Sequence, residues 1–363
     1  MMKLEVTRTT LPPFEEYCDE IRALWDSHWV TNLGPKHEAF ERALSDRTGC
    51  AVALFANGHL ALEAALQGLG LPEGSEVITT PFTFVSTTHA IIRCGLKPVF
   101  CDVRASDGTL DPALLEEHIT EQTSAILPVH VYGQVCDVEK IGEAAARHGL
   151  KVVYDAAHAF GVRYQGKPVE SFGDASVLSF HATKVFSTVE GGAVCYRDTA
   201  LGQRLQDLRN FGIRDTEHCE AIGGNAKLDE FRAAMGLCNL RHLDQVLSAR
   251  KEAVRLYREL LEKNSRSRPL ISYRSDIEYN WAYFPVLFPT QEERDAVHDA
   301  LKARGIGARK YFWPLTSDAG CYRDSRFFTP GFTPVARDLS SRVLCLPLSP
   351  YITPQQIRSV CYW

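Results

Sequence analysis

The sequence predicts an α/β protein, with a mostly parallel sheet of seven strands in a large domain and a smaller α+β domain after it. Three observations lead to this prediction. Short runs rich in apolar residues alternate with helical stretches over roughly the first 200 residues. Several runs are almost continuously apolar, as is typical of strands covered by helices on both faces. Near residue 240 the alternation gives way to one long amphipathic stretch, which marks the change of architecture.

Helix signals separate the seven predicted strands. Asp111 followed by Pro112 is a typical helix start, because aspartate caps the first turn and proline fits the first helical position. Asp137 is expected to begin another helix, whose apolar positions share one face until Gly149 ends it. The strands themselves are expected at residues 52–55, 76–80, 98–103, 125–129, 151–154, 175–180 and 193–196.

The change near residue 240 divides the chain into two expected domains, residues 1–240 and 241–363. Apolar residues recur at helical spacing from Leu243 to Leu261 and predict a long helix leading into the second domain. That domain is expected to contain a strand at 283–288 and a helix at 291–304. The proline-rich stretch 330–354 is expected to be a surface loop.

Composition excludes several classes of protein. The chain has 363 residues, 45% hydrophobic and 23% charged, which excludes a disordered or fibrous protein. The 40 basic and 45 acidic residues give a net charge of −5, which argues against a general nucleic-acid binder. We expect no transmembrane helix and no secretory signal, because the required apolar segments are absent. The 11 cysteines include no C-x-x-C pair, so we expect no metal site and a cytoplasmic protein.

Three segments at predicted strand ends carry possible chemistry. The turn at residues 56–60 opens a helix whose free N–H groups suit a phosphate, although such turns are commonly structural. Asp155 would keep a bound ring nitrogen protonated or else cap a helix. Lys184 leaves a buried strand and would be a nucleophile or else an ordinary surface lysine. Together the three match pyridoxal 5′-phosphate (PLP), which carries a phosphate, a pyridine nitrogen and an aldehyde.

A set of longer motifs then recurs in order along nearly the whole chain. The motifs are Trp29–Gly34, Asn57–Gly58, Thr80–Phe84, Ile126–Gly133, Asp155–His158, Ser179–Lys184 and Gly224–Lys227. They resemble the sugar aminotransferases of the DegT/DnrJ/StrS family, which are PLP enzymes of fold type I with an aspartate aminotransferase-like fold. Residues 29–32 and 154–162 are most similar to the VioA-type branch, which makes dTDP-4-amino-4,6-dideoxyglucose.

The resemblance implies three catalytic residues. Lys184 would bind the cofactor covalently and later move protons between the cofactor and the sugar carbon. Asp155 would pair with the protonated pyridine nitrogen, and His158 would contact the phenolic oxygen of the cofactor. His130 and His181 also lie near strand ends, where each would line the pocket or simply pack.

The remaining cofactor contacts follow from the same resemblance. Phe84 would stack on the ring, while Ser179 and the turn formed by Gly58, His59 and Leu60 would hold the phosphate. The family commonly has threonine or serine where this chain has His59, so a compact hydroxyl ligand is lost and backbone N–H groups remain. Relatives can also carry tryptophan at position 84, and phenylalanine keeps the stacking with less area.

Partners and substrates are implied as well. Asn225 is similar to an asparagine that reaches the phosphate in the partner subunit, which implies a homodimer with shared active sites. Thr31 and Asn32 are expected to contact substrate. Tyr311 is expected to do so too, because residues 309–313 resemble a segment that closes over the nucleotide-sugar.

The implied reaction is transamination of a dTDP-linked keto sugar with L-glutamate, which leaves as 2-oxoglutarate. The expected conversion is dTDP-4-keto-6-deoxy-D-glucose to dTDP-4-amino-4,6-dideoxy-D-glucose. A 3-keto-sugar aminotransferase would carry the same residues and stays open as an alternative. Deoxygenating relatives carry histidine at the lysine position, so Lys184 argues against a lyase. A non-catalytic regulator is less favoured, because no DNA-binding helix pair is visible.

Overall fold

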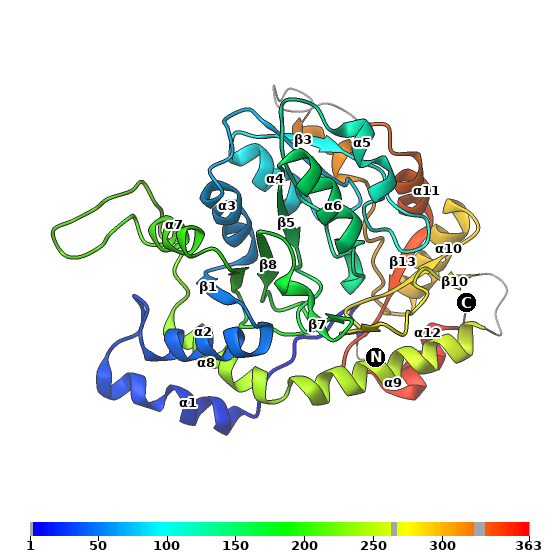
Figure 1. Cartoon of the computed structure of the whole chain (residues 1–363). Helices are drawn as coiled ribbons and strands as arrows, with labels where there is room; N and C mark the ends of the chain where they lie inside the picture. Colours follow the sequence, from blue (N-terminus) through cyan, green and yellow to red (C-terminus); the bar gives the residue numbers. More distant parts are fainter. Residues whose placement is uncertain (1–2, 263–266, 323–330, 363) are drawn as a thin grey trace.

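A sheet of seven strands runs through the middle of the molecule, with helices packed around it (Figure 1). The computed structural model describes residues 3–262, 267–322 and 331–362. The strands are β1 (Ala51–Phe55), β2 (Glu76–Thr79), β3 (Lys97–Phe100), β4 (Thr123–Ile126), β5 (Lys151–Asp155), β8 (Ala175–Ser179) and β9 (Gly192–Tyr196). Their order is β1-β9-β8-β5-β4-β2-β3. The pairs from β8 to β3 are parallel, whereas β9 is antiparallel to both neighbours. The predicted seven-stranded, mostly parallel sheet is confirmed.

Helices and short turns connect these strands. The helices are α1 (Phe14–Ser27), α2 (Pro35–Thr48), α3 (Gly58–Gly68), α4 (Val85–Arg93), α5 (Leu115–His118), α6 (Val138–His148), α7 (Thr199–Arg209) and α8 (Glu230–Arg241). The 3-10 turns are η1 (Pro112–Leu114), η2 (Val131–Gly133) and η3 (Val169–Ser171). Asp111 caps η1 and Asp137 caps α6, each accepting a backbone hydrogen bond. Gly149 ends α6 in the left-handed conformation at φ 66°. These three predicted signals are confirmed.

The sheet has an apolar cluster on each face, which explains its continuously apolar strands. Leu54 and Phe55 are neighbours in β1 and both fully buried, yet they belong to different clusters. Successive side chains of a strand point to opposite faces, so a strand covered on both sides needs apolar residues at every position.

The second part of the chain begins with the predicted long helix, α9 (Leu243–Leu261). A three-stranded antiparallel sheet follows, in the order β10 (Arg268–Pro269), β12 (Phe284–Leu287) and β13 (Val343–Leu346). A second small sheet joins β6 (Arg163–Tyr164) and β7 (Lys167–Pro168) to β11 (Ile277–Glu278). The second part of the chain also contains three helices, α10 (Gln291–Ala303), α11 (Pro334–Arg342) and α12 (Pro354–Val360), and the turns η4 (Thr316–Asp318) and η5 (Gly320–Tyr322). The predicted strand and helix at 283–288 and 291–304 are thereby confirmed to within a residue.

The expectation of a surface loop over residues 330–354 was wrong. Residue 330 lies outside the described residues, but α11 and the fully buried strand β13 occupy much of the rest. The prolines do not break these elements. Pro334 stands in the first turn of α11, where the missing N–H has no partner to lose.

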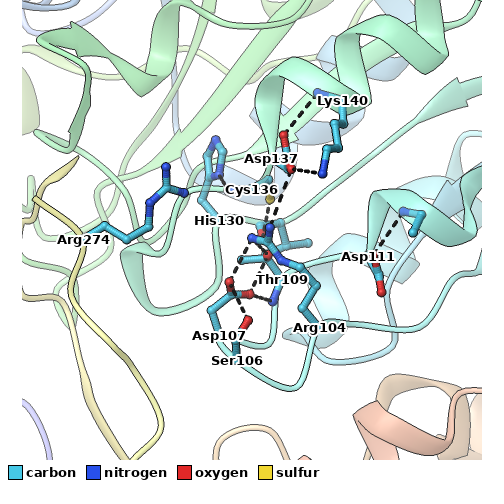
Figure 2. A network of polar contacts seen from close by, with 12 residues as sticks. Arg104, Ser106, Asp107, Thr109, Asp111, His130, Cys136, Asp137, Lys140 and Arg274 are labelled. Carbon is cyan, nitrogen blue, oxygen red and sulfur yellow. Dashed lines mark hydrogen bonds and ion pairs between the residues drawn. The ribbon is translucent and has the colours of Figure 1, made fainter. Parts of the chain in front are cut away.

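A polar network ties the loop after β3 to the start of α6, as Figure 2 shows. Arg104 lies 2.9 Å from Asp107 and 3.8 Å from Asp137. Beside it, the Cys136 N–H donates to Nδ1 of His130 at 3.1 Å. The His130 ring stacks on Tyr154 with centroids 4.8 Å apart, and burial lowers the pKa of His130 to about 3. Of the two readings left open for His130, the structure favours packing, since the residue does not line the cavity described below.

None of the helices in the described ranges combines the length and the apolar character needed to cross a lipid bilayer.

Candidate active site

A cavity of about 710 Å³ opens where strands β4, β5 and β8 end and helix α3 begins. This is the edge at which open α/β sheets bind ligands. The predicted site residues that line it are Gly58, His59, Leu60, Phe84, Asp155, His158, Ser179, Lys184 and Tyr311. Residues as far apart in the sequence as Gly58 and Tyr311 are therefore brought to one place.

Asp155 is the last residue of β5 and is buried beside the cavity. Its Oδ2 accepts a hydrogen bond from the Thr87 hydroxyl at 2.8 Å, and its Oδ1 accepts one from the Ala157 N–H at 3.1 Å. Burial raises the pKa of Asp155, while these hydrogen bonds and the charge of Lys184 oppose the rise. A buried carboxylate of this kind is stabilised by a cationic N–H facing it, which a protonated pyridine nitrogen provides.

Lys184 lies in the turn after β8, and its N–H donates to the His181 carbonyl at 2.9 Å. The pKa of Lys184 is lowered to about 8, because the lowering by burial outweighs the raising by the charge of Asp155, and the charge of Arg309 also lowers it. A lysine with a lowered pKa has more neutral amine at physiological pH and is a better nucleophile.

His158 is a neutral imidazole with a defined tautomer. Its Nδ1 accepts a hydrogen bond from the Tyr132 N–H at 3.1 Å, so the ring proton lies on Nε2. Burial lowers the pKa of His158 well below its usual range. The ring is stacked with Phe312 at 6.0 Å between centroids, which fixes its plane. Nε2 can therefore donate to an oxygen of a bound ligand.

The predicted phosphate turn is a capped helix start. The Asn57 side chain accepts from the Leu60 N–H at 2.9 Å. Within the part of the chain that the structure describes, the N–H groups of Gly58 and His59 have no protein acceptor. A Cβ at Gly58 would lie 2.8 Å from the Ser179 Cβ, so glycine is what lets the turn pack against the end of β8. These N–H groups at a helix N-terminus, with Ser179 adjacent, suit a phosphate.

The side chain of His59 is already engaged by the protein. Its Nδ1 lies 2.9 Å from the Ser86 hydroxyl, and its Nε2 lies 3.2 Å from Glu63. Glu63 also pairs with Arg93. The prediction that His59 binds phosphate therefore rests on its backbone N–H more than on its ring.

Aromatic side chains form one wall of the cavity. The Phe84 side chain stands at the start of α4 and is 54% exposed, because it faces the cavity. Tyr311 stacks on Phe312 with centroids 4.7 Å apart, and its carbonyl accepts a hydrogen bond from the Tyr132 hydroxyl. A flat ring bound in the cavity would thus meet aromatic surface, and the stacking of Phe84 on such a ring stays a prediction.

Several residues of the site were not predicted. Thr87, which holds Asp155, is a helix residue without a recognisable motif. Arg309 was expected only as part of a closing segment. His181, which was expected either to line the pocket or to pack, lines the cavity, and its ring lies 3.5 Å from Glu190. His181 stands three residues before Lys184, so its position beside that lysine was the available signal, whereas Arg309 was marked only by the motif at residues 309–313.

Three predicted residues lie outside the cavity of the single chain. Asn225 follows a loop that extends away from the molecule after α7 (Figure 1), and its side chain accepts from Lys227 at 2.8 Å. Thr31 and Asn32 are exposed in the turn before α2. Their roles remain predictions, and each needs a partner subunit or a bound substrate to be fulfilled.

A lysine with a lowered pKa, a buried acid, a neutral histidine and N–H groups at a helix start that have no acceptor among the described residues are the features that a PLP-dependent enzyme of fold type I requires. The donor set fits that cofactor: N–H groups for its phosphate, Asp155 for its ring nitrogen and Lys184 for its aldehyde. Residues 14–362 match the DegT/DnrJ/EryC1/StrS aminotransferase family, and the chain belongs to it. The predicted family, fold class, cofactor and enzyme class are confirmed.

Individual relatives cover almost the whole chain. The chain is 42% identical over 348 residues to the dTDP-4-amino-4,6-dideoxy-D-glucose transaminase of Shigella dysenteriae, covering 94% of this chain and 93% of that one. The Escherichia coli protein of the same name is 38% identical over 351 residues, covering 95% and 93%. The crystal structure of DesI in the presence of its TDP-sugar product superimposes with a TM-score of 0.93 at 34% identity, covering 99% and 92%.

Proposed function

We propose that this aminotransferase converts dTDP-4-keto-6-deoxy-D-glucose to dTDP-4-amino-4,6-dideoxy-D-glucose, with L-glutamate as the amino donor. The observation that carries the proposal is the assembly of Lys184, Asp155, His158 and the phosphate turn in one cavity of an aminotransferase. The names of the Shigella dysenteriae and Escherichia coli relatives support the choice of sugar.

Each residue has a physical task in this reaction. PLP, when bound, supplies an electron sink for the carbon that carries the transferred nitrogen. Asp155 keeps positive charge at the ring nitrogen, and the Thr87 hydroxyl holds that carboxylate in place. The Lys184 amine removes a proton from the donor carbon and returns one to the sugar carbon, a role that suits its lowered pKa. His158 donates from Nε2 and fixes the phenolic oxygen. The aromatic wall excludes water from the reacting atoms.

A homodimer with shared active sites is part of the proposal. Phe211, Ile213 and Ile222 are exposed on the loop after α7, and Ile222 is 99% exposed. Large apolar side chains on an extended loop favour burial against another chain. Asn225 lies at the end of the same loop, so docking of this loop would bring it to the partner's cofactor phosphate.

The domain boundaries and location also remain proposals. We propose that the chain forms two domains, residues 1–240 and 241–363. This division is supported by an apolar cluster, separate from the two that cover the large sheet, whose buried members all lie between Ala253 and Val360. We further propose a cytoplasmic enzyme acting in O-antigen or related lipopolysaccharide biosynthesis, in keeping with its nucleotide-sugar substrate.

A substrate panel tests the proposal. Purified protein is incubated with PLP, glutamate and a set of 3-keto and 4-keto sugars linked to dTDP and UDP, and products are identified by mass spectrometry and NMR. We expect 4-amination of the dTDP 4-keto sugar and no product with Lys184→Ala. A 3-amino product would establish the alternative reaction, and no product from dTDP-4-keto-6-deoxy-D-glucose would refute the specific assignment.

A further inference from the structure

One buried amide joins the second part of the chain to the loop that carries His158. Asn280 lies shortly before β12 and is 1% exposed. Its side-chain NH2 group donates to the His158 carbonyl at 2.8 Å and to the Phe160 carbonyl at 3.0 Å. Its Oδ1 accepts from the Ala282 N–H at 3.1 Å. The amide has a single orientation that satisfies all three contacts, because two of the partners are acceptors and one is a donor.

The turn that contains Asn280 is held by a buried arginine of α9. Arg250 is fully buried, and its Nη1 donates to the Trp281 carbonyl at 3.2 Å and to the Ala282 carbonyl at 3.3 Å. Between these contacts Trp281 takes a φ of 56°, which is unfavourable for a residue with a side chain. The arginine therefore stabilises an unusual path of the backbone, and this path directs the Asn280 amide toward the loop of His158.

Two neighbours show how closely this turn fits against His158. The buried Tyr283 belongs to the same turn, and the centre of its ring lies 4.8 Å from the centre of the His158 ring. A Cβ added to Gly133 would lie 2.6 Å from Oδ1 of Asn280 and 3.1 Å from the His158 carbonyl oxygen. Glycine at this position therefore leaves the room that the amide needs to reach that carbonyl.

His158 is thus held at both of its ends. Its ring accepts a hydrogen bond at Nδ1 from the Tyr132 N–H at 3.1 Å, and its backbone carbonyl accepts one from Asn280. Two single bonds connect the backbone of a histidine to its ring. The position of Nε2 in the cavity therefore depends on the backbone contact as well as on the ring contact, since a displaced backbone carries the ring with it.

We infer that Asn280 is a positioning residue for His158, which it holds so that Nε2 meets the phenolic oxygen of bound PLP; this rests on the contact assigned to His158 in the proposed function. The alternative is that the amide only joins two parts of the chain. These two roles differ in what they affect. A joint between two parts of the chain affects stability alone, whereas a residue that positions His158 also affects the cofactor.

The absorbance of bound PLP makes the difference measurable. The visible band of PLP bound at Lys184 changes with pH, because the proton shared by the phenolic oxygen and the lysine nitrogen is lost as the pH rises. The oxygen carries more negative charge after this loss. A hydrogen bond from His158 therefore favours the loss and lowers the pH at which it occurs. Weakening that hydrogen bond raises the midpoint of the pH titration.

The test compares holoenzyme as wild type, Asn280→Ala, His158→Ala and the double variant. Tyr257→Phe is the matched control, because the buried Tyr257 hydroxyl also donates to a backbone carbonyl, that of Pro347 at 2.8 Å, and does so outside the cavity. The absorbance of bound cofactor is recorded against pH for each protein. Melting temperatures, measured in parallel, report the effect of each substitution on stability.

His158→Ala should raise the midpoint by about one pH unit, the effect of losing a hydrogen bond to a charged oxygen. Asn280→Ala should raise it by about half a unit, since His158 is still present but no longer fixed. The double variant should match His158→Ala alone, because Asn280 acts through His158. Tyr257→Phe should lower the melting temperature and leave the midpoint unchanged.

Two results would overturn the positioning role. One is an unchanged midpoint in Asn280→Ala, and the other is an equal rise from this substitution with and without His158. If Asn280→Ala does not fold, Asn280→Leu keeps nearly the same volume without the donors, and the same two results decide.

Failure of the proposed function is distinguishable from these results. If His158→Ala leaves the midpoint unchanged, the contact assigned to His158 is wrong, and the positioning role of Asn280 is overturned with it. If the midpoints shift as expected but no sugar of the panel is aminated, the sugar assignment fails and the role of Asn280 stands.

Discussion

Replacing Thr87 by valine tests how Asp155 is held. The Thr87 hydroxyl lies 2.9 Å from that of Thr83 and donates to Asp155 at 2.8 Å, and all three side chains are buried. Valine keeps the branched shape of threonine and removes the donor. Because a hydrogen bond to the ionised carboxylate is lost, the substitution raises the pKa of Asp155 further above its usual range.

The size of the effect follows from that one hydrogen bond. A hydrogen bond to a charged group contributes about 1.5–3 kcal/mol. The Ala157 N–H remains in place, and part of the lost energy is common to the protein with and without cofactor. We therefore take the lower end, about 1.5 kcal/mol, which corresponds to a roughly tenfold higher Kd for PLP. The deficit should grow as the pH falls, because pairing with the pyridine nitrogen requires ionised Asp155.

The assay is a PLP titration of the apo protein at several pH values, followed by cofactor absorbance. Thr88→Val is the matched control, since Thr88 is the next residue of α4, is equally buried and bonds to Thr316 at 3.1 Å instead. The control should bind PLP like wild type. Unchanged PLP affinity in Thr87→Val at every pH would refute the assigned role of this hydroxyl.

Two further predictions concern Lys184 and the dimer. The rate at which apo protein takes up PLP should rise with pH and level off above about 8. The reason is that the neutral Lys184 amine is the reactive form, and its pKa is lowered to about 8 from 10.5. A rate that does not change with pH across this range would contradict this prediction. Mixing the Lys184→Ala and Asn225→Ala variants under subunit exchange should restore activity, because a mixed dimer has one intact shared site; no recovery in mixtures shown to exchange subunits would argue against shared sites.

Much of the fold was predictable because strands covered on both faces must be apolar at every position, as Leu54 and Phe55 illustrate. The antiparallel direction of β9 could not be predicted, because the direction of a strand depends on the path of the chain between strands and not on the residues of the strand itself. The buried strand β13 was not predicted, because the prolines near it in the sequence indicate a loop rather than regular secondary structure.

The candidate site divides in the same way. Asp155 and Lys184 were predictable because each follows an apolar strand, where a charged residue is conspicuous. Thr87 acts through a hydrogen bond from a helix, and no pattern in the sequence marks that contact. Arg309 reaches the cavity through pairing with Cys345, which only the folded chain shows.

That pairing has a consequence for how the protein is made. The cavity is lined by residues from Asn57 to Phe312, and Arg309 is anchored on β13, whose last residue is Leu346. During synthesis Lys184 therefore leaves the ribosome before β13, the strand that anchors Arg309 at the cavity, has been made. We therefore expect the complete cavity to form late in synthesis. A chain interrupted before β13 would contain Lys184 and the turn at the start of α3 but would lack the strand that holds Arg309 at the cavity.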